Sequence, residues 1–135
     1  MREIKFRVWH KEFKRFLGKE EYCLDLDGKL IFVELQYDSN VILKAVNPLF
    51  YILQQFTGLK DKNSKEIYEG DIVKTVKIND TYPQIFIGGV VYNPYDCCFI
   101  INSQLPHLRN CSFRDMLSTN LEILGNIFEK SDLLK

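Results

Sequence analysis

The chain has little of what several classes of protein require. Lys plus Arg and Asp plus Glu number 18 each among 135 residues, so the surface as a whole has no net charge with which to attract nucleic acid or an anionic membrane. No apolar run approaches the ~18 residues that cross a bilayer, and no signal-peptide pattern opens the sequence. We therefore predict a cytoplasmic protein with no membrane partner.

Cysteine is scarce as well. The four cysteines are Cys23, Cys97, Cys98 and Cys111, and they form no Cys-x-x-Cys pair. A zinc site would have to combine Cys97, Cys98, Cys111 and His107. Adjacent cysteines on a strand point to opposite faces, which disfavours this set. With 46% hydrophobic residues the chain can build a core without disulfides. We expect reduced thiols, no metal and no cofactor.

The patterns that are present predict a mainly β fold with minor helix. Residues 4–9 alternate between apolar and basic side chains, as a half-buried strand does, although the aromatic residues over 6–16 also fit a helical stripe. Asp27-Gly28 separates two apolar segments and predicts a tight hairpin. Residues 49–56 fit either a short helix that begins at Pro48 or a buried strand. The short strands that follow predict a small antiparallel barrel or sandwich.

Three blocks of sequence resemble the YopX family of phage and prophage proteins. The central block is FTGLKDKNSKEIYEGDIV over residues 56–73; the others are the opening MREIKFRVW and EILGNIFE over 122–129. Together they keep the order of the family and span nearly the whole chain. The family motif residues, to which we assign structural roles, are Thr57, Gly58, Asp61, Tyr68, Glu69, Gly70, Asp71, Gly125 and Asn126.

This resemblance implies a small, mostly β protein with an SH3-like barrel after the central motif, and no established reaction. We expect one YopX-like domain over 1–135, with a possible subdivision into an N-terminal hairpin region over 1–57, a barrel core over 58–129 and a frayed tail over 130–135. The chain departs from the family at Ser64, where glycine normally completes an Asn-Gly turn, and at His10, where an acidic residue commonly follows the Trp. Serine is strained at positive φ, which puts a strict type I′ turn in doubt.

The acidic residues of the central motif, Glu66, Glu69 and Asp71, are candidates for acid–base chemistry or for a divalent cation. A glycine between two of them favours a bend, so we expect Gly70 to turn the backbone and Asp71 to accept hydrogen bonds from nearby backbone N–H groups. No Ser, His and Asp trio, nucleophile elbow or phosphate-binding glycine loop accompanies the cluster. We therefore expect no enzyme activity.

Charge is distributed unevenly along the sequence. Residues 1–19 hold seven Lys and Arg against two Glu, a net +5, and the remainder holds 11 against 16, a net −5. The candidate binding residues are Arg2, Lys5, Arg7, Trp9, Lys14 and Arg15. Because Lys5 and Arg7 should face away from Phe6 and Val8, we do not expect basic and aromatic groups to interleave on one surface.

These observations favour a non-enzymatic accessory protein that binds a host or phage protein, or itself as a homo-oligomer through its opposite charges. The alternative is nucleic-acid binding through the basic segment, where cations would contact phosphates. We expect Trp9 to anchor the core under the first hairpin; an exposed Trp9 would instead indicate a binding surface. The two histidines receive no role.

Overall fold

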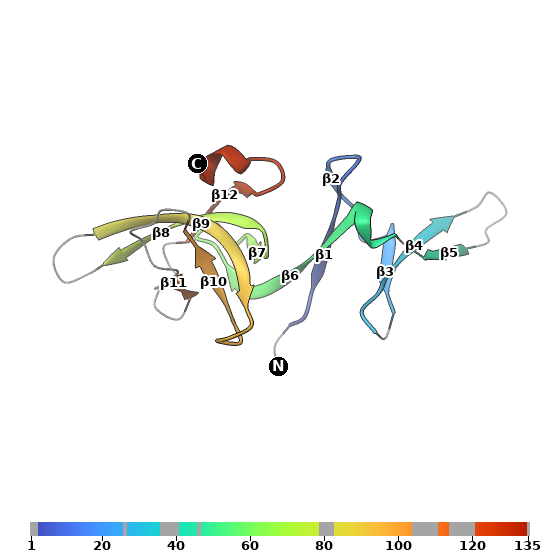
Figure 1. Cartoon of the computed structure of the whole chain (residues 1–135), viewed down its shortest axis with the longest axis horizontal. Helices are drawn as coiled ribbons and strands as arrows, with labels where there is room; N and C mark the ends of the chain where they lie inside the picture. The colour runs from blue at the N-terminus through green and yellow to red at the C-terminus, as the bar shows by residue number, and fades with distance from the viewer. Residues whose placement is uncertain are drawn as a thin grey trace. The chain divides into compact units, whose positions relative to one another are not determined.

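The computed structural model describes residues 3–25, 27–35, 41–45, 47–78, 83–103, 111–113 and 121–134 (Figure 1). The chain divides into two compact units. The hairpin unit is Phe6–Gln54, and the barrel unit combines Met1–Lys5 with Gln55–Lys135. The boundary near residue 54 lies close to the subdivision suggested at residue 57, but the first five residues belong with the C-terminal part of the chain.

The first hairpin of the hairpin unit forms as its alternation predicts. β1 (Phe6–His10) pairs antiparallel with β2 (Arg15–Phe16), so that Trp9 lies opposite Phe16. On its other side β1 neighbours β6 (Tyr51–Lys60), which begins in the hairpin unit and ends in the barrel unit. Val8, Trp9 and His10 of β1 are all buried rather than alternating in exposure, so both faces of this part of the strand are covered.

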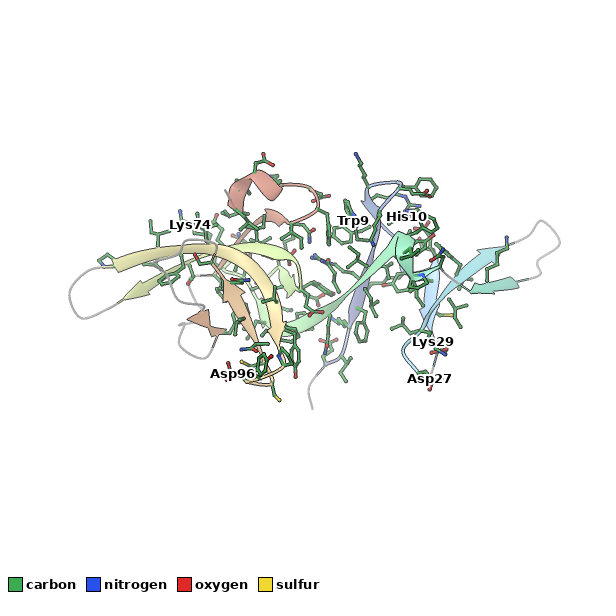
Figure 2. The ribbon with its side chains drawn as sticks, in the orientation of Figure 1. Trp9, His10, Asp27, Lys29, Lys74 and Asp96 are labelled. Atoms are coloured by element: carbon green, nitrogen blue, oxygen red, sulfur yellow. The ribbon has the colours of Figure 1, made fainter. Side chains whose placement is uncertain are left out.

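A second sheet of the hairpin unit contains β3 (Tyr22–Leu24), β4 (Leu30–Leu35) and β5 (Val41–Ala45) in that order. The predicted hairpin between the first two is confirmed, with Gly28 at a φ of +77°. The Asp25 carboxylate accepts hydrogen bonds from the backbone N–H groups of Asp27 and Lys29, the two residues labelled at this turn in Figure 2. A side chain therefore closes the turn.

Residues 47–60 combine both structures that the sequence left open. Pro48–Phe50 form a 3₁₀ turn, η1. The Asn47 side chain caps it by accepting the Leu49 N–H at 3.0 Å. β6 follows at once, so most of the segment is a strand. Pro48 begins the helical turn, as its fixed φ allows.

The barrel unit contains β7 (Glu66–Tyr68), which pairs with the end of β6, and a five-stranded antiparallel sheet. Its order is β11 (Cys111–Ser112), β10 (Cys98–Asn102), β9 (Pro83–Asn93), β8 (Asp71–Ile78) and β12 (Glu122–Asn126). Figure 1 shows the long β9 curving across this unit. The predicted fold class, mainly β and antiparallel with a barrel-like curl, is confirmed.

Gly88 and Gly89 lie inside β9 and do not form a turn. A Cβ atom at Gly88 would lie 2.5 Å from the carbonyl oxygen of Asn102, whereas one at Gly89 would make ordinary contacts. Gly88 thus permits a close approach of backbone between β9 and the end of β10. This approach accompanies the curvature that encloses the core of the barrel unit.

The end of the chain is more ordered than expected. Ser131–Leu134 form a 3₁₀ turn, η4, which packs against β9 instead of fraying. The Leu133 N–H donates to the Lys130 carbonyl at 3.1 Å. Among the residues that the structure describes, no helix has the length and apolar character to cross a membrane.

Candidate functional site

The carboxylate of Glu66 is occupied by two partners within the barrel unit. One oxygen lies 2.5 Å from Nζ of Lys5, and the other accepts the Tyr68 hydroxyl at 2.8 Å. The hydrogen bond from Lys5, and then that from Tyr68, lowers the pKa of Glu66, while the same contact raises the pKa of Lys5. Lys5 also contacts Glu3 at 3.0 Å. Lys5, one of the candidate binding residues, therefore forms ion pairs within its own chain.

Glu69 binds β6 at Gln55, the first residue of that strand in the barrel unit. Its carboxylate accepts the Gln55 N–H at 2.9 Å, and its own N–H donates to the Gln55 carbonyl at 3.0 Å. One residue on, the Phe56 N–H donates to the Lys5 carbonyl at 2.9 Å. Glu66 and Glu69 thus bind residues at the two ends of the hairpin unit's segment: Lys5, after which the chain leaves the barrel unit, and Gln55, where it returns.

Gly70 and Asp71 form the step between two sheets. Gly70 has a φ of +75°, and both its N–H and its carbonyl are hydrogen-bonded, to Val90 and Ile127 respectively. Asp71 is only 2% exposed; its carboxylate accepts the Tyr68 N–H at 2.9 Å and lies 3.5 Å from the Asn126 amide nitrogen. The glycine turns the backbone and the carboxylate caps the turn, which is a structural arrangement.

The three acidic side chains therefore accept hydrogen bonds from different groups, although Glu66 and Asp71 both bind Tyr68, through its hydroxyl and its backbone N–H respectively. Glu66 and Glu69 are half-buried and Asp71 is buried. Within the described ranges, His, Cys, Asp and Glu side chains form no group of three or more that would hold a metal ion.

Other motif residues build the loop after β6 and its neighbours. Gly58 has a φ of +89° where the register between β6 and β7 shifts, and the Thr57 hydroxyl donates to the Ile67 carbonyl at 2.8 Å. Asp61 accepts the N–H groups of Asn63, Lys65 and Ile123. Burial opposes ionisation of Asp61, but these three backbone donors together hold its pKa below the ordinary value.

Ser64 adopts the conformation that glycine would adopt more readily. Its φ is +65°, and its N–H donates to the Asp61 carbonyl at 2.9 Å. The described residues before it in the turn have negative φ, so the turn is not type I′, which needs two consecutive residues at positive φ. Gly125 marks a further register shift, in β12, and Asn126 is buried beside Asp71.

Arg7 of the basic segment makes contacts within the hairpin unit. Arg7 donates to the Gln54 side chain at 2.8 Å, and its guanidinium lies 4.5 Å from the centre of the Phe16 ring. Trp9 is 3% exposed and packs edge-on against the same ring at 5.0 Å. Arg7 and Trp9 share one face of β1 and both contact the Phe16 ring, so a basic and an aromatic side chain meet here, in addition to the predicted separation of Arg7 from Phe6 and Val8.

Arg15 forms a two-point contact with Glu21 in the same unit, at 2.7 and 2.9 Å. Arg15, and then the N–H of Gly18, lowers the pKa of Glu21 to about 2. Lys14 is exposed and has a φ of +49°, and Arg2 lies outside the described residues. Of the four candidates in the hairpin unit, Trp9 is buried, Arg7 and Arg15 bind residues of their own unit, and Lys14 is exposed.

Charge balance within each unit changes the interpretation of the uneven sequence. The hairpin unit contains seven Lys and Arg and seven Asp and Glu, which leaves 11 of each for the barrel unit. The basic excess of the first 19 residues is thus balanced mostly by acidic residues of the hairpin unit itself, Glu21 among them. Each unit is therefore neutral by formal charge.

A cluster of exposed apolar residues escaped the sequence analysis. We call it the tip patch: Phe13 in the turn between β1 and β2, with Pro48, Leu49 and Phe50 of η1. Leu49 is 72% exposed, Phe13 67% and Phe50 39%. The two segments are joined by a 2.9 Å hydrogen bond from the Lys11 N–H to the Phe50 carbonyl. The only sequence signal for it is Phe13 itself, an aromatic residue placed between charged neighbours.

The buried His10 contacts Phe13 of the tip patch. Its ring lies 4.1 Å from that of Phe13 and 4.6 Å from that of Tyr51, and it is 4% exposed. Nδ1 lies 3.3 Å from the backbone nitrogen of Phe13, and Nε2 lies 3.2 Å from the Tyr51 hydroxyl. Figure 2 labels His10 beside Trp9 on β1. The residue that departs from the family pattern thus holds the turn that carries Phe13.

Comparison with known proteins agrees with this architecture. The family model described as YopX protein matches residues 5–135, so the membership predicted from three blocks is confirmed. The fold is similar to that of protein yopX from Bacillus subtilis, with a TM-score of 0.65, 16% identity and 100% of both chains covered. Protein EF1440 from Enterococcus faecalis has a TM-score of 0.58 at 22% identity, with 98% of this chain and 99% of that chain covered. No curated protein sequence matches the chain.

Proposed function

We propose that this chain, which belongs to the YopX family, is a non-enzymatic module that binds another protein through the tip patch. The observation that supports this function is that Phe13, Leu49 and Phe50, each more than a third exposed, lie on two segments that a backbone hydrogen bond from Lys11 to Phe50 joins. Single exposed apolar residues are common on soluble proteins, whereas a group of them is typical of an interaction site. Aromatic side chains in such groups commonly supply most of the binding energy.

The tip patch is pre-organised for binding. Asn47 caps η1, the Lys11 N–H binds the Phe50 carbonyl, and His10 binds the backbone of Phe13. Ordering these residues on association therefore costs less conformational entropy than ordering a free loop would. A patch held in this way favours a specific partner.

The charged residues around Phe13 indicate the chemistry of that partner. Lys11 and Lys14 are exposed on either side of Phe13, with Glu12 as the acidic neighbour. A segment of another protein in which Asp or Glu flanks apolar anchors would match this arrangement. We favour such a partner over a second copy, because each unit is electrically neutral.

The proposal includes the finer features that family resemblance implies. The barrel unit is an SH3-like barrel, the protein is encoded by a phage or prophage, and it acts in the cytoplasm of the bacterial host. In this view the motif carboxylates act in the fold rather than in chemistry, since Glu66, Glu69 and Asp71 each bind residues of the chain itself.

Selection from a displayed library of random short peptides tests the proposal. We expect the recovered peptides to combine apolar anchors with Asp or Glu. The Leu49→Ser variant should bind a recovered synthetic peptide at least about tenfold more weakly, because loss of a central apolar contact costs about 2 kcal/mol. Ile85→Ser is the matched control, since Ile85 is 57% exposed on β9 of the barrel unit.

Three outcomes contradict the proposal. Equal weakening by Leu49→Ser and Ile85→Ser would show that the tip patch is not the site. Sedimentation that shows dimers of the wild type and monomers of Leu49→Ser would assign the patch to a second copy. A catalytic turnover that is lost in Asp71→Ala, with the fold retained, would show that the protein is an enzyme.

A further inference from the structure

We infer that His10 is a pH-sensitive positioning residue that holds the tip patch in its binding conformation only while its ring is neutral. This inference rests on the proposed function, because it concerns the regulation of the same surface. It starts from the placement of the ring: His10 is 4% exposed and touches Phe13 on one side and Tyr51 on the other.

The hydrogen bonds define the tautomer of the ring. A backbone N–H is a donor only, so Nδ1, which lies 3.3 Å from the Phe13 nitrogen, must accept. The proton of a neutral ring then sits on Nε2, where it faces the Tyr51 hydroxyl oxygen at 3.2 Å. Both ring nitrogens have a partner only in this neutral form.

A second proton on the ring affects one side alone. It must bind Nδ1, where it would face the Phe13 N–H, and two donors cannot share a hydrogen bond. The contact between Nε2 and Tyr51 survives, because Nε2–H remains a donor. Protonation therefore removes the bond to the turn that carries Phe13 and leaves the ring anchored to β6. Phe13 is then free to move, while the ring of His10 stays bound to Tyr51 of β6.

The charged and titratable groups around His10 come from three segments. From the turn, Lys11, Glu12 and Lys14 are exposed. From β6, the Tyr51 hydroxyl has a pKa raised by burial, with Glu12 adding to the effect, so it keeps its proton. From the segment after β2, Glu21 is bound to Arg15 and to the Gly18 N–H and has a pKa of about 2, so it stays ionised.

Nuclear magnetic resonance of the wild-type chain provides a test that needs no partner. At about pH 8 the ring nitrogens should report the tautomer protonated on Nε2, and the Phe13 amide should be protected from exchange. As the pH is lowered until the ring resonances report a charged His10, the Phe13 amide should lose its protection over the same pH range as the change in the ring. A Phe13 amide that stays protected while His10 becomes charged would overturn the inference.

Peptide affinity provides the second test, with a peptide recovered from the library as the probe. Wild-type affinity should fall about fivefold between about pH 8 and the pH at which the ring resonances report a charged His10, since one hydrogen bond that positions Phe13 is lost. In the His10→Asn variant the side-chain oxygen can accept the Phe13 N–H and does not titrate, so affinity should change less than about twofold. His107→Asn, which removes the other histidine, should behave as the wild type does.

The two proposals fail in different ways. If Leu49→Ser does not weaken binding at pH 8, the proposed function is wrong, and the resonance measurement still decides whether His10 controls the Phe13 turn. If binding depends on Leu49 but is equally strong at both pH values, or falls equally in His10→Asn, the pH-sensitive role is wrong and the docking surface stands.

Discussion

The barrel unit encloses a contiguous apolar core, whereas the hairpin unit is held largely by paired aromatic and polar side chains. Seven buried residues form the core of the barrel unit: Ile67, Val73, Phe86, Val90, Phe99, Ile101 and Leu121. In the described part of the hairpin unit the buried apolar residues are Val8, Trp9 and Leu17. Its other contacts include Arg7 on Phe16 and Arg15 with Glu21.

This difference determines what each unit responds to. Apolar burial does not depend on pH and is little affected by salt, whereas exposed ion pairs depend on both. The single tryptophan, Trp9, is buried in the hairpin unit, so its fluorescence reports that unit alone. Amide hydrogen exchange reports the barrel unit in the same sample. The following substitutions use these two measurements to separate the units, beginning with the largest expected effect.

Gly88→Ala should destabilise the barrel unit by about 3 kcal/mol, because the new Cβ would lie 2.5 Å from the Asn102 carbonyl oxygen and backbone must move. Gly89→Ala is the matched control. Its Cβ would lie 3.5 Å from the nearest atom, an Ile127 methyl group, and should cost less than about 1 kcal/mol. The stability of the barrel unit in both variants is measured by denaturant unfolding, with amide hydrogen exchange as the readout. Equal effects would mean that close approach at Gly88 does not shape the sheet.

Thr75→Val should stabilise the barrel unit by about 1 kcal/mol. Thr75 is fully buried on β8, and its hydroxyl has no hydrogen-bond partner within the part of the chain that the structure describes. Valine has nearly the same shape and removes the cost of that buried hydroxyl. Thr75→Ser, which keeps the hydroxyl and loses a methyl group, should destabilise the unit. A loss of stability in Thr75→Val would show that the hydroxyl is satisfied in solution.

Ser64→Gly should stabilise the barrel unit by about 1 kcal/mol, since glycine adopts a φ of +65° without the strain that a Cβ imposes. The greater freedom of glycine in the unfolded chain offsets part of this gain. Ser64→Ala keeps the Cβ and should give no gain. If both variants unfold at the same denaturant concentration as the wild type, the strain at this turn is negligible.

Local patterns predicted the strands and hairpins well, because alternation and turn residues act over a few neighbours. The glycine between Glu69 and Asp71 predicted the turn at Gly70 and the hydrogen bond from a backbone N–H to Asp71 for the same reason. The sequence could not predict that Glu66 binds Lys5, since the two residues are 61 positions apart. Nor could it predict the tip patch, which depends on the meeting of Lys11 with Phe50. Contacts of this kind arise from the order of strands in space, which no local pattern contains.

The contact between Arg7 and Phe16 shows a different limit. The alternation of β1 predicted that Phe6 and Val8 lie on one face of the strand. The same period of two places Arg7 and Trp9 together on the opposite face. What the pattern lacked was the partner strand: β2 supplies Phe16, which lies across from Trp9. A correct period therefore still needs the pairing register before it assigns contacts.

The smallest expected effect lies in the hairpin unit and concerns acid. Arg15, and then the Gly18 N–H, lowers the pKa of Glu21 to about 2 from an ordinary value of 4.5. A carboxyl whose pKa is lower in the folded state stabilises that state above its ordinary pKa, and this contribution is lost as the pH falls from about 4.5 to about 2. Because both partners are at least a third exposed, solvent screening limits the effect to about 0.5 kcal/mol.

Glu21→Gln should therefore lower the stability reported by Trp9 fluorescence at neutral pH and flatten its decline below pH 4.5. Glu20→Gln, at the exposed neighbouring position, is the control and should keep the wild-type acid profile. The barrel unit, followed by hydrogen exchange, should show no difference between the two variants. If Glu21→Gln changes the acid response of the barrel unit as much as that of Trp9, the two units unfold together and their different means of stabilisation cannot be separated by pH.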